Sequence, residues 1–201
     1  MAATNNGATQ IRHIKTLLDT SSIANLRRMA EKATQTFNQG VPVQVEVASG
    51  FIIECATIVS VATAIIAGIS TEPGNNLTSN GTAKTLTTGF KVPNQASASV
   101  IPIGAPPNDG TIGFVLATES MLFVGTLGGS TTGNPAIAQT MLGAIRGLTK
   151  DAGNAFWYVD NDITTTAGGA CVQIVDFVDP VGTVNGKVIF KITKAAQQIM
   201  V

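Results

Sequence analysis

Charged residues are scarce in this chain of 201 residues, and their charges cancel. Lys and Arg number 12, Asp and Glu also number 12, and together they form only 12% of the sequence. The chain lacks the clustered basic surface that contact with nucleic-acid phosphates needs, so we predict no nucleic-acid partner. A surface so poor in charge is typical of a protein that neighbouring subunits cover. An ordinary β-rich domain with many Thr-lined strands is the alternative.

Histidine and cysteine are also nearly absent. His13 is the only histidine, and the adjacent Arg12 disfavours the imidazolium that a catalytic base forms. We therefore expect His13 to be peripheral or at an interface, and we predict no catalytic residue and no enzyme activity. One histidine and two cysteines cannot complete a four-ligand zinc site without carboxylates. Cys55 and Cys171 lie in apolar strand patterns and are predicted to be buried thiols, with a disulfide across the core as the alternative.

Two segments resemble functional loops but lack residues that such loops require. The glycine-rich segment 125–134 has no Lys-Ser or Lys-Thr pair to reach a phosphate, so turn formation explains it better. Asp160 and Asp162 could offer oxygen ligands to calcium, with Asp176 and Asp179 as further candidates if the fold brings them close. No EF-hand spacing follows, and paired loop carboxylates usually cap turns. We predict no metal and no cofactor.

Hydrophobic runs of membrane length are also missing, with one near exception. Residues 51–69 are almost wholly apolar or small, but Glu54 interrupts them and β-branched residues are frequent. Strands buried on both faces give the same pattern. We interpret this run as two adjacent core strands joined by a short turn and predict no membrane association. The start of the chain, M-A-A-T-N-N-G-A-T-Q, has no charged segment followed by an apolar core, so we expect no secretory signal.

The N-terminal segment, in contrast, is rich in basic residues. Apolar residues at positions 11, 14, 17 and 18, and again at 23, 26, 29, 30, 33 and 37, follow helical spacing, so residues 1–40 are predicted to form a helical arm that packs on the body or on another subunit. This segment contains five cationic residues and two carboxylates, so its net charge is +3 and the net charge of the rest of the chain is −3. A solvated helix face explains this equally well, but the cations are candidate binding residues: Arg12, Lys15, Arg27, Arg28 and Lys32.

From residue 41 onward the pattern changes to strands. V-P-V-Q-V-E-V alternates apolar and polar residues, and short β-branched runs separated by Gly, Pro, Asn and Asp recur to the end of the chain. We predict strands at 82–92, 99–103, 112–117, 121–127, 156–159 and 172–178. The fold class is therefore mainly β, a single barrel or jelly-roll-like sandwich over residues 41–201. One exception is 134–148, where a capping Asn, a Pro and an apolar face predict a short helix.

Residues 171–192 read C-V-Q-I-V-D-F-V-D-P-V-G-T-V-N-G-K-V-I-F-K-I. Two runs of β-branched and aromatic residues flank an Asp-Pro corner, and Asn185-Gly186 is the pair favoured at the centre of a type I′ turn. The segment predicts two antiparallel strands with the reversal at Asn185-Gly186.

This ending, together with the preceding F-W-Y-V-D, resembles the C-terminal part of the small capsid decoration (cement) proteins of tailed bacteriophages. The matched pattern is V-x-I-V-x-F-V-D followed by V-G-x-V-N-G-K-V-x-F, over about the last quarter of the chain. The resemblance implies a virion protein, made in the host bacterial cytoplasm, that binds the outer surface of the major capsid protein lattice as a homotrimer and stabilises the head. The alternative is a tail or head-fibre subunit, or another β-sandwich protein that binds a host glycan. An aromatic platform would favour this alternative, but Trp157 and Tyr158 are the only residues of their types, and we expect them to alternate across one strand.

Overall fold

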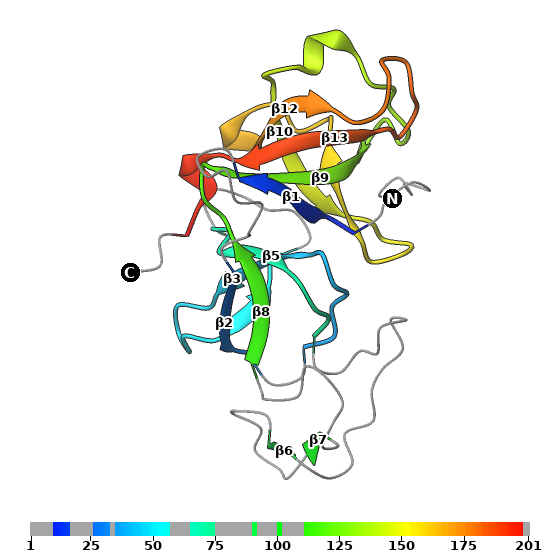
Figure 1. Cartoon of the computed structure of the whole chain (residues 1–201). Helices are drawn as coiled ribbons and strands as arrows, with labels where there is room; N and C mark the ends of the chain where they lie inside the picture. The colour runs from blue at the N-terminus through cyan, green and yellow to red at the C-terminus, as the bar shows by residue number, and fades with distance from the viewer. Residues whose placement is uncertain are drawn as a thin grey trace.

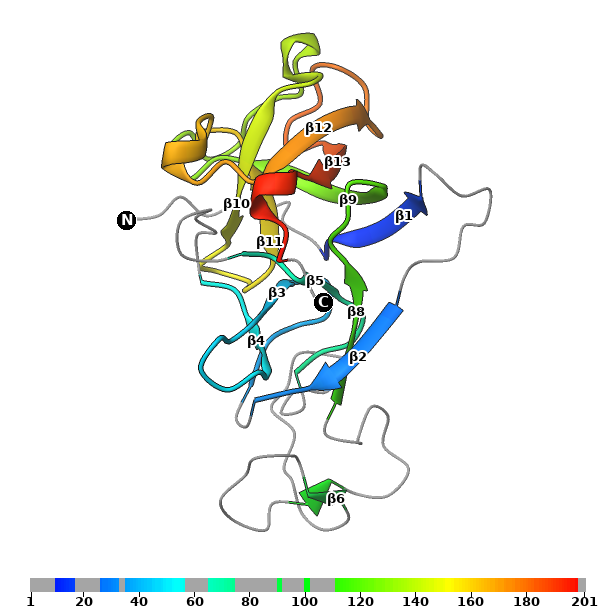
Figure 2. The ribbon, with the colours of Figure 1, turned by 90° about the vertical axis from the view of Figure 1, so that its left-hand side faces the viewer.

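The computed structural model describes residues 10–16, 26–32, 35–56, 65–74, 90–91, 100–101 and 111–198. The protein is mainly β, as predicted, and its two larger sheets lie one above the other (Figures 1 and 2). Helical structure in the described ranges is limited to three short 3-10 turns. These are η1 (Gln139–Met141), η2 (Thr166–Gly168) and η3 (Lys194–Ala196).

The upper sheet closes into a five-stranded barrel. Its strands, in order around the barrel, are β9 (Met121–Gly128), β11 (Trp157–Asp160), β10 (Ile145–Lys150), β12 (Val172–Phe177) and β13 (Lys187–Ile192). The antiparallel pairing of β13 with β9 closes the ring, and β11 runs parallel to β9. A sixth strand, β1 (Arg12–Thr16), pairs with β9 outside the ring.

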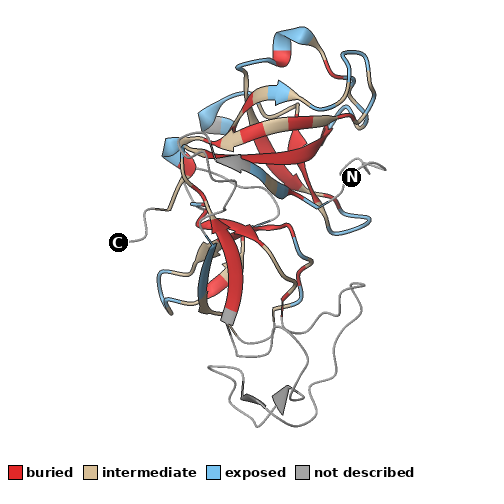
Figure 3. Cartoon of the chain, viewed as in Figure 1, coloured by how far each residue is buried: buried red, intermediate tan, exposed pale blue. Residues whose placement is uncertain are grey.

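Alternation along the barrel strands fills its interior with large apolar side chains. Trp157 and Val159 of β11 are fully buried in the core, as are Phe123 of β9 and Phe190 of β13. The rings of Phe123 and Phe190 lie 5.9 Å apart between centroids. Figure 3 shows that the barrel strands are mostly buried and that the loops at their upper end are mostly exposed. Removal of this apolar surface from water is the main force that stabilises the barrel.

The lower sheet has five strands and also curls toward closure. Its order is β2 (Leu26–Ala30), β8 (Thr111–Leu116), β5 (Gly68–Ser70), β3 (Pro42–Val45) and β4 (Ile52–Glu54). Glu31, which follows β2, forms a parallel bridge to Ile52 and so joins the two outer strands. Gly68 is required where β5 approaches β8, because a Cβ atom there would overlap the carbonyl oxygen of Val115. A separate two-stranded pairing joins β6 (Phe90–Lys91) and β7 (Val100–Ile101).

The two sheets share their polypeptide connections and one apolar core. β8 of the lower sheet continues through residues 117–120 into β9 of the barrel. The C-terminal segment returns to the lower sheet, where the Gln198 side chain accepts a hydrogen bond from the Val45 amide at 2.7 Å and donates to the Val45 carbonyl at 2.9 Å. A side-chain amide thus extends the ladder of β3 beyond the end of β5. The core cluster includes buried residues of both sheets, among them Ile69 and Leu148.

The predicted N-terminal helices are wrong where the structure describes the segment. Residues 12–16 and 26–30 are strands β1 and β2, paired antiparallel with β9 and β8 respectively. Helical spacing at Ile11 and Ile14 does not correspond to a common buried face, because Ile11 is buried and Ile14 is exposed. Sheet partners roughly 80 to 110 positions away along the chain determine the conformation here. The remainder of the predicted helices, residues 17–25 and 33–34, lies outside the described ranges.

The helix predicted over 134–148 is also wrong. Only η1 is helical, and residues 145–150 form barrel strand β10. Gly143 takes a φ of +79°, which ends the turn and lets the chain enter the barrel. Ile137 and Met141 are buried as a helical face would be, but they cover the barrel from an irregular segment.

The final strand pair is confirmed, but the predicted turn is wrong. β12 and β13 pair antiparallel, and the connection between them spans residues 178–186. Asn185 has a φ of +50°, whereas Gly186 is not in the positive-φ region, so the pair does not form a type I′ turn. A Cβ atom at Gly186 would lie 2.5 Å from Cδ1 of Ile137. Close packing, and not backbone freedom, explains glycine at this position.

The apolar run 51–69 supplies two strands of the lower sheet, but they are not adjacent. β3 lies between β4 and β5. Residues 57–64 of the run lie outside the described ranges, as do most of the predicted strands at 82–92 and 99–103. Within the ranges given above, no helix has the length and apolar character needed to cross a bilayer.

Candidate functional site

The loop between β12 and β13 carries an unusual group of exposed apolar side chains. Val178, Val181 and Val184 are 52%, 54% and 57% exposed, and all three lie within residues 178–186, which we call the valine loop. The loop lies at the upper end of the barrel, next to the segment that contains η1 (Figures 1 and 3). Single exposed apolar residues are common on proteins, but several in one loop mark a surface suited to contact with another protein.

The valine loop is held in place by main-chain hydrogen bonds to the neighbouring segment 134–138. The amide of Gly182 donates to the carbonyl of Ile137 at 2.8 Å, and the amide of Ile137 donates to the carbonyl of Thr183 at 3.0 Å. The amide of Asn185 donates to the carbonyl of Pro135 at 3.0 Å. These bonds reduce the entropy that the loop loses on binding, so the exposed valines are preorganised for a partner.

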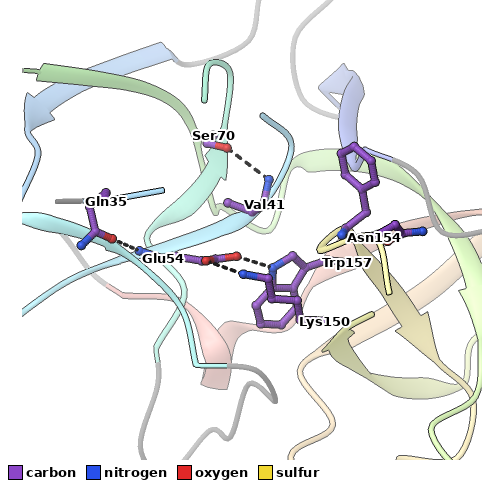
Figure 4. Close-up of polar contacts among 8 residues, drawn as sticks. Gln35, Val41, Glu54, Ser70, Lys150, Asn154 and Trp157 are labelled. Carbon is purple, nitrogen blue, oxygen red and sulfur yellow. Dashed lines mark hydrogen bonds and ion pairs between the residues drawn. The ribbon is translucent and has the colours of Figure 1, made fainter. Parts of the chain in front are cut away.

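The contact between the two sheets contains a polar cluster around Glu54, at the end of β4 (Figure 4). Its Oε1 accepts from the indole nitrogen of Trp157 at 2.9 Å, and its Oε2 accepts from Nζ of Lys150 at 2.7 Å. The amide of Glu54 donates to the side-chain oxygen of Gln35 at 3.2 Å. Trp157 and Lys150 belong to the barrel, so one carboxylate joins the two sheets. The cluster satisfies a buried indole N–H and is structural in character.

The structure does not bring the five predicted cationic residues together. Arg28 on β2 pairs with Glu72 at 2.7 Å, and Lys32 pairs with Glu46 at 2.5 Å. The hydrogen bond from Lys32, followed by one from Ser49, holds the pKa of Glu46 below its ordinary value. These ion pairs leave Arg28 and Lys32 less free to attract a partner.

The other three cations occupy different strands. Arg27 is exposed on β2 of the lower sheet, and Arg12 is exposed on β1 beside the barrel. Lys15 also belongs to β1, but its side chain lies outside the described part of the structure. Charge at these positions is thus divided between the two sheets instead of forming one basic surface.

Asp160 and Asp162 bind the glycine-rich segment 125–134 of their own chain. Oδ1 of Asp160 accepts from the amide of Ser130 at 3.1 Å, and Oδ2 accepts from the Thr149 hydroxyl at 2.7 Å. Oδ2 of Asp162 accepts from the amides of Thr131 and Thr132 at 2.7 and 2.9 Å. Burial raises the pKa of Asp162, but these hydrogen bonds outweigh it and the net pKa is lowered. The two segments that resembled a calcium loop and a phosphate loop therefore stabilise each other.

Asp176 and Asp179 do not join Asp160 and Asp162 in a metal site among the described residues. Oδ1 of Asp176 accepts from the amide of Phe177 at 2.8 Å, and Oδ2 of Asp179 accepts from the amide of Lys187 at 2.7 Å. No group of three or more His, Cys, Asp or Glu side chains that could hold a metal ion occurs among the described residues.

His13 lies on β1, whereas Cys55 and Cys171 lie in the core. The ring of His13 is edge-on to Phe123, at 6.0 Å between centroids. Cys55 and Cys171 are buried free thiols, as predicted. Burial raises the pKa of Cys171 to about 12, although a hydrogen bond from the Leu148 backbone opposes this. Burial also raises the pKa of Cys55 well above its ordinary value, and the nearby Cys171 adds to the effect. Two protonated thiols in a core are poor nucleophiles.

The aromatic pair considered for glycan binding is inside the protein. Trp157 is fully buried and Tyr158 is 1% exposed, on opposite faces of β11. Sequence reasoning missed the valine loop and the Glu54 cluster. The clustering of three valines around Asp-Pro and Gly was a signal for the first, whereas Glu54 and Trp157 are 103 positions apart and nothing in the sequence connects them. Comparison of the chain with protein-family models, curated proteins and solved structures gave no match.

Proposed function

We propose that this chain is a capsid decoration protein of a tailed bacteriophage, which binds the outer surface of the major capsid protein lattice and stabilises the mature head. The observation that carries the proposal is the preorganised valine loop, because three exposed valines on a fixed backbone form a contact surface. The loop also lies within the segment that resembles the decoration proteins. That resemblance further suggests a homotrimer on the virion surface.

The mechanism is mass action, and it involves no catalysis. A protein that binds only the assembled lattice stabilises that lattice by its free energy of association. Burial of each half-exposed valine contributes roughly 1 kcal/mol, so the three together contribute about 3 kcal/mol, or about a hundredfold in affinity. The alternative, a glycan-binding fibre subunit, finds less support because Trp157 and Tyr158 are buried.

The test uses capsids of the phage that encodes the chain, prepared without it. We expect the parent protein to co-sediment with these capsids and to raise the temperature at which the heads release DNA. The triple variant Val178→Ser, Val181→Ser and Val184→Ser should bind about a hundredfold more weakly. Val47→Ser is the matched control, since Val47 is 95% exposed but lies in the β3–β4 turn of the lower sheet.

Two results would contradict the proposal at different levels. If the triple variant and the parent bound capsids equally, the valine loop would not be the contact. If the parent itself neither bound the capsids nor changed the temperature of DNA release, the decoration function would be rejected.

A further inference from the structure

A cavity of about 330 Å³ opens on the outer face of the barrel, where β1 and β9 separate. β1 pairs with β9 up to the pair Arg12–Val124, and β11 joins β9 only at Leu127. The stretch of β9 between these points has no strand on that edge, and the cavity lies against it. Its lining residues are Gln10, Arg12, Val124, Gly125, Phe156 and Lys187.

The two charged residues that line this cavity, Arg12 and Lys187, are both cations. Arg12 is exposed and Lys187 is half-buried, and neither side chain has an ion-pair partner among the described residues. None of the described residues that line the cavity is a carboxylate. The neighbouring Asp179 accepts a hydrogen bond from the main-chain amide of Lys187, which turns that carboxylate toward the backbone. Two unpaired cations beside one cavity attract an anionic group.

The rest of the lining is apolar or can bond to a peptide. Val124 is buried and Phe156 is half-buried, so these two provide a surface for an apolar side chain, and Gln10 offers an amide that both donates and accepts. A volume of 330 Å³ is at the lower end of the range for ligand pockets, about 300–1,000 Å³, and accommodates one or two side chains.

We propose that this cavity binds an acidic segment of a partner protein, with one Asp or Glu carboxylate between Arg12 and Lys187 and an adjacent apolar side chain against Val124 and Phe156. Nucleic acid is disfavoured because phosphate tracking needs more cations than two. The cavity adjoins the valine loop at Lys187, but none of the three valines of that loop is among its lining residues. Binding there is a property of the free protein and can be measured without capsids.

The experiment is a titration of ¹⁵N-labelled full-length protein followed by amide chemical shifts. The probes are acetyl-Phe-Glu-Leu-amide, the matched acetyl-Phe-Gln-Leu-amide, and inorganic phosphate. We expect the Glu peptide to shift the amides of Val124 and Gly125 with a Kd of about 1 mM or tighter. The Gln peptide and phosphate should bind at least about fivefold more weakly, since each lacks one of the two contacts.

Variants locate the site. The double variant Arg12→Gln and Lys187→Gln should weaken binding of the Glu peptide at least about fivefold. Lys191→Gln is the matched control, because Lys191 is on the same strand but does not line the cavity. It should bind as the parent does, and unchanged amide spectra elsewhere will show that each variant is folded.

Several results would overturn the proposal. Equal binding of the Glu and Gln peptides would exclude recognition of a carboxylate. Phosphate that bound as tightly as the Glu peptide would show a simple anion site. Shifts that did not include Val124 and Gly125, or that survived loss of both cations, would place the peptide elsewhere.

Discussion

Glu54→Ala tests whether a single carboxylate couples the two sheets. The substitution leaves the indole N–H of Trp157 without its acceptor in a fully buried position, which costs about 1–3 kcal/mol. It also removes the partner of Lys150, whose side chain is 24% exposed and can reach water, so this loss adds only about 0–1 kcal/mol. We expect the free energy of unfolding to fall by about 1–4 kcal/mol in total.

Glu54→Gln separates the two contributions. The amide oxygen can still accept from Trp157, while the amide nitrogen cannot pair with the ammonium of Lys150, so the expected loss is about 1 kcal/mol or less. Glu46→Gln is the matched control, since Glu46 pairs with Lys32 on the same sheet but contacts no indole. Its effect should be smaller than that of Glu54→Ala.

The assay is denaturant unfolding followed by fluorescence of Trp157, the only tryptophan, with circular dichroism as a second probe. Coincident transitions justify a single free energy for each variant. A change below about 0.5 kcal/mol for Glu54→Ala, the range of an ordinary surface substitution, would refute the reasoning. Equal losses for Glu54→Ala and Glu54→Gln would show that the indole contact contributes nothing.

Two further predictions concern packing. Gly186→Ala should lower the free energy of unfolding by about 1–2 kcal/mol, because the new methyl group would overlap Cδ1 of Ile137. Adding Ile137→Val to the same chain removes that Cδ1 and should restore part of the lost stability in thermal unfolding. If it restored none, the cost of Gly186→Ala would come from the backbone and not from the overlap. Cys55 and Cys171 should react with a thiol reagent only as fast as the protein unfolds. Their raised pKa values further predict stability that is full below the ordinary thiol pKa, about 8.5, and falls as pH rises toward 12, a loss that Cys→Ala variants should reduce.

Short strands with strong local patterns could be predicted from the sequence, whereas conformations set by pairing with distant segments could not. The runs that became β8, β9, β11 and β12 are β-branched or aromatic and are bounded by turn residues, so their local preference agrees with the sheet. The segments around Ile11 and Ile145 also satisfy helical spacing. Their conformation is decided by pairing with β9 and with β11 and β12, and a period of three to four cannot reveal such partners.

In the candidate site, too, features set by neighbouring residues could be predicted and features set by distant contacts could not. The strands on either side of Asn185-Gly186 were predicted correctly, but the turn was not, because the connection spans residues 178–186 and Gly186 packs against Ile137, some fifty positions earlier. The buried thiols followed from the apolar residues around them. The exposure of the valines depends on how the barrel ends, which composition alone does not specify.

The closure of the barrel by β13 determines when the protein can complete folding during synthesis. β9 receives β1 from the start of the chain, but its other edge stays open until residues 187–192 have left the ribosome. Until then a nascent chain carries an exposed strand edge of apolar residues, a known risk for aggregation. The barrel therefore cannot close before β13 has been synthesised, and a pause or truncation before β13 should yield insoluble chains instead of a smaller soluble domain.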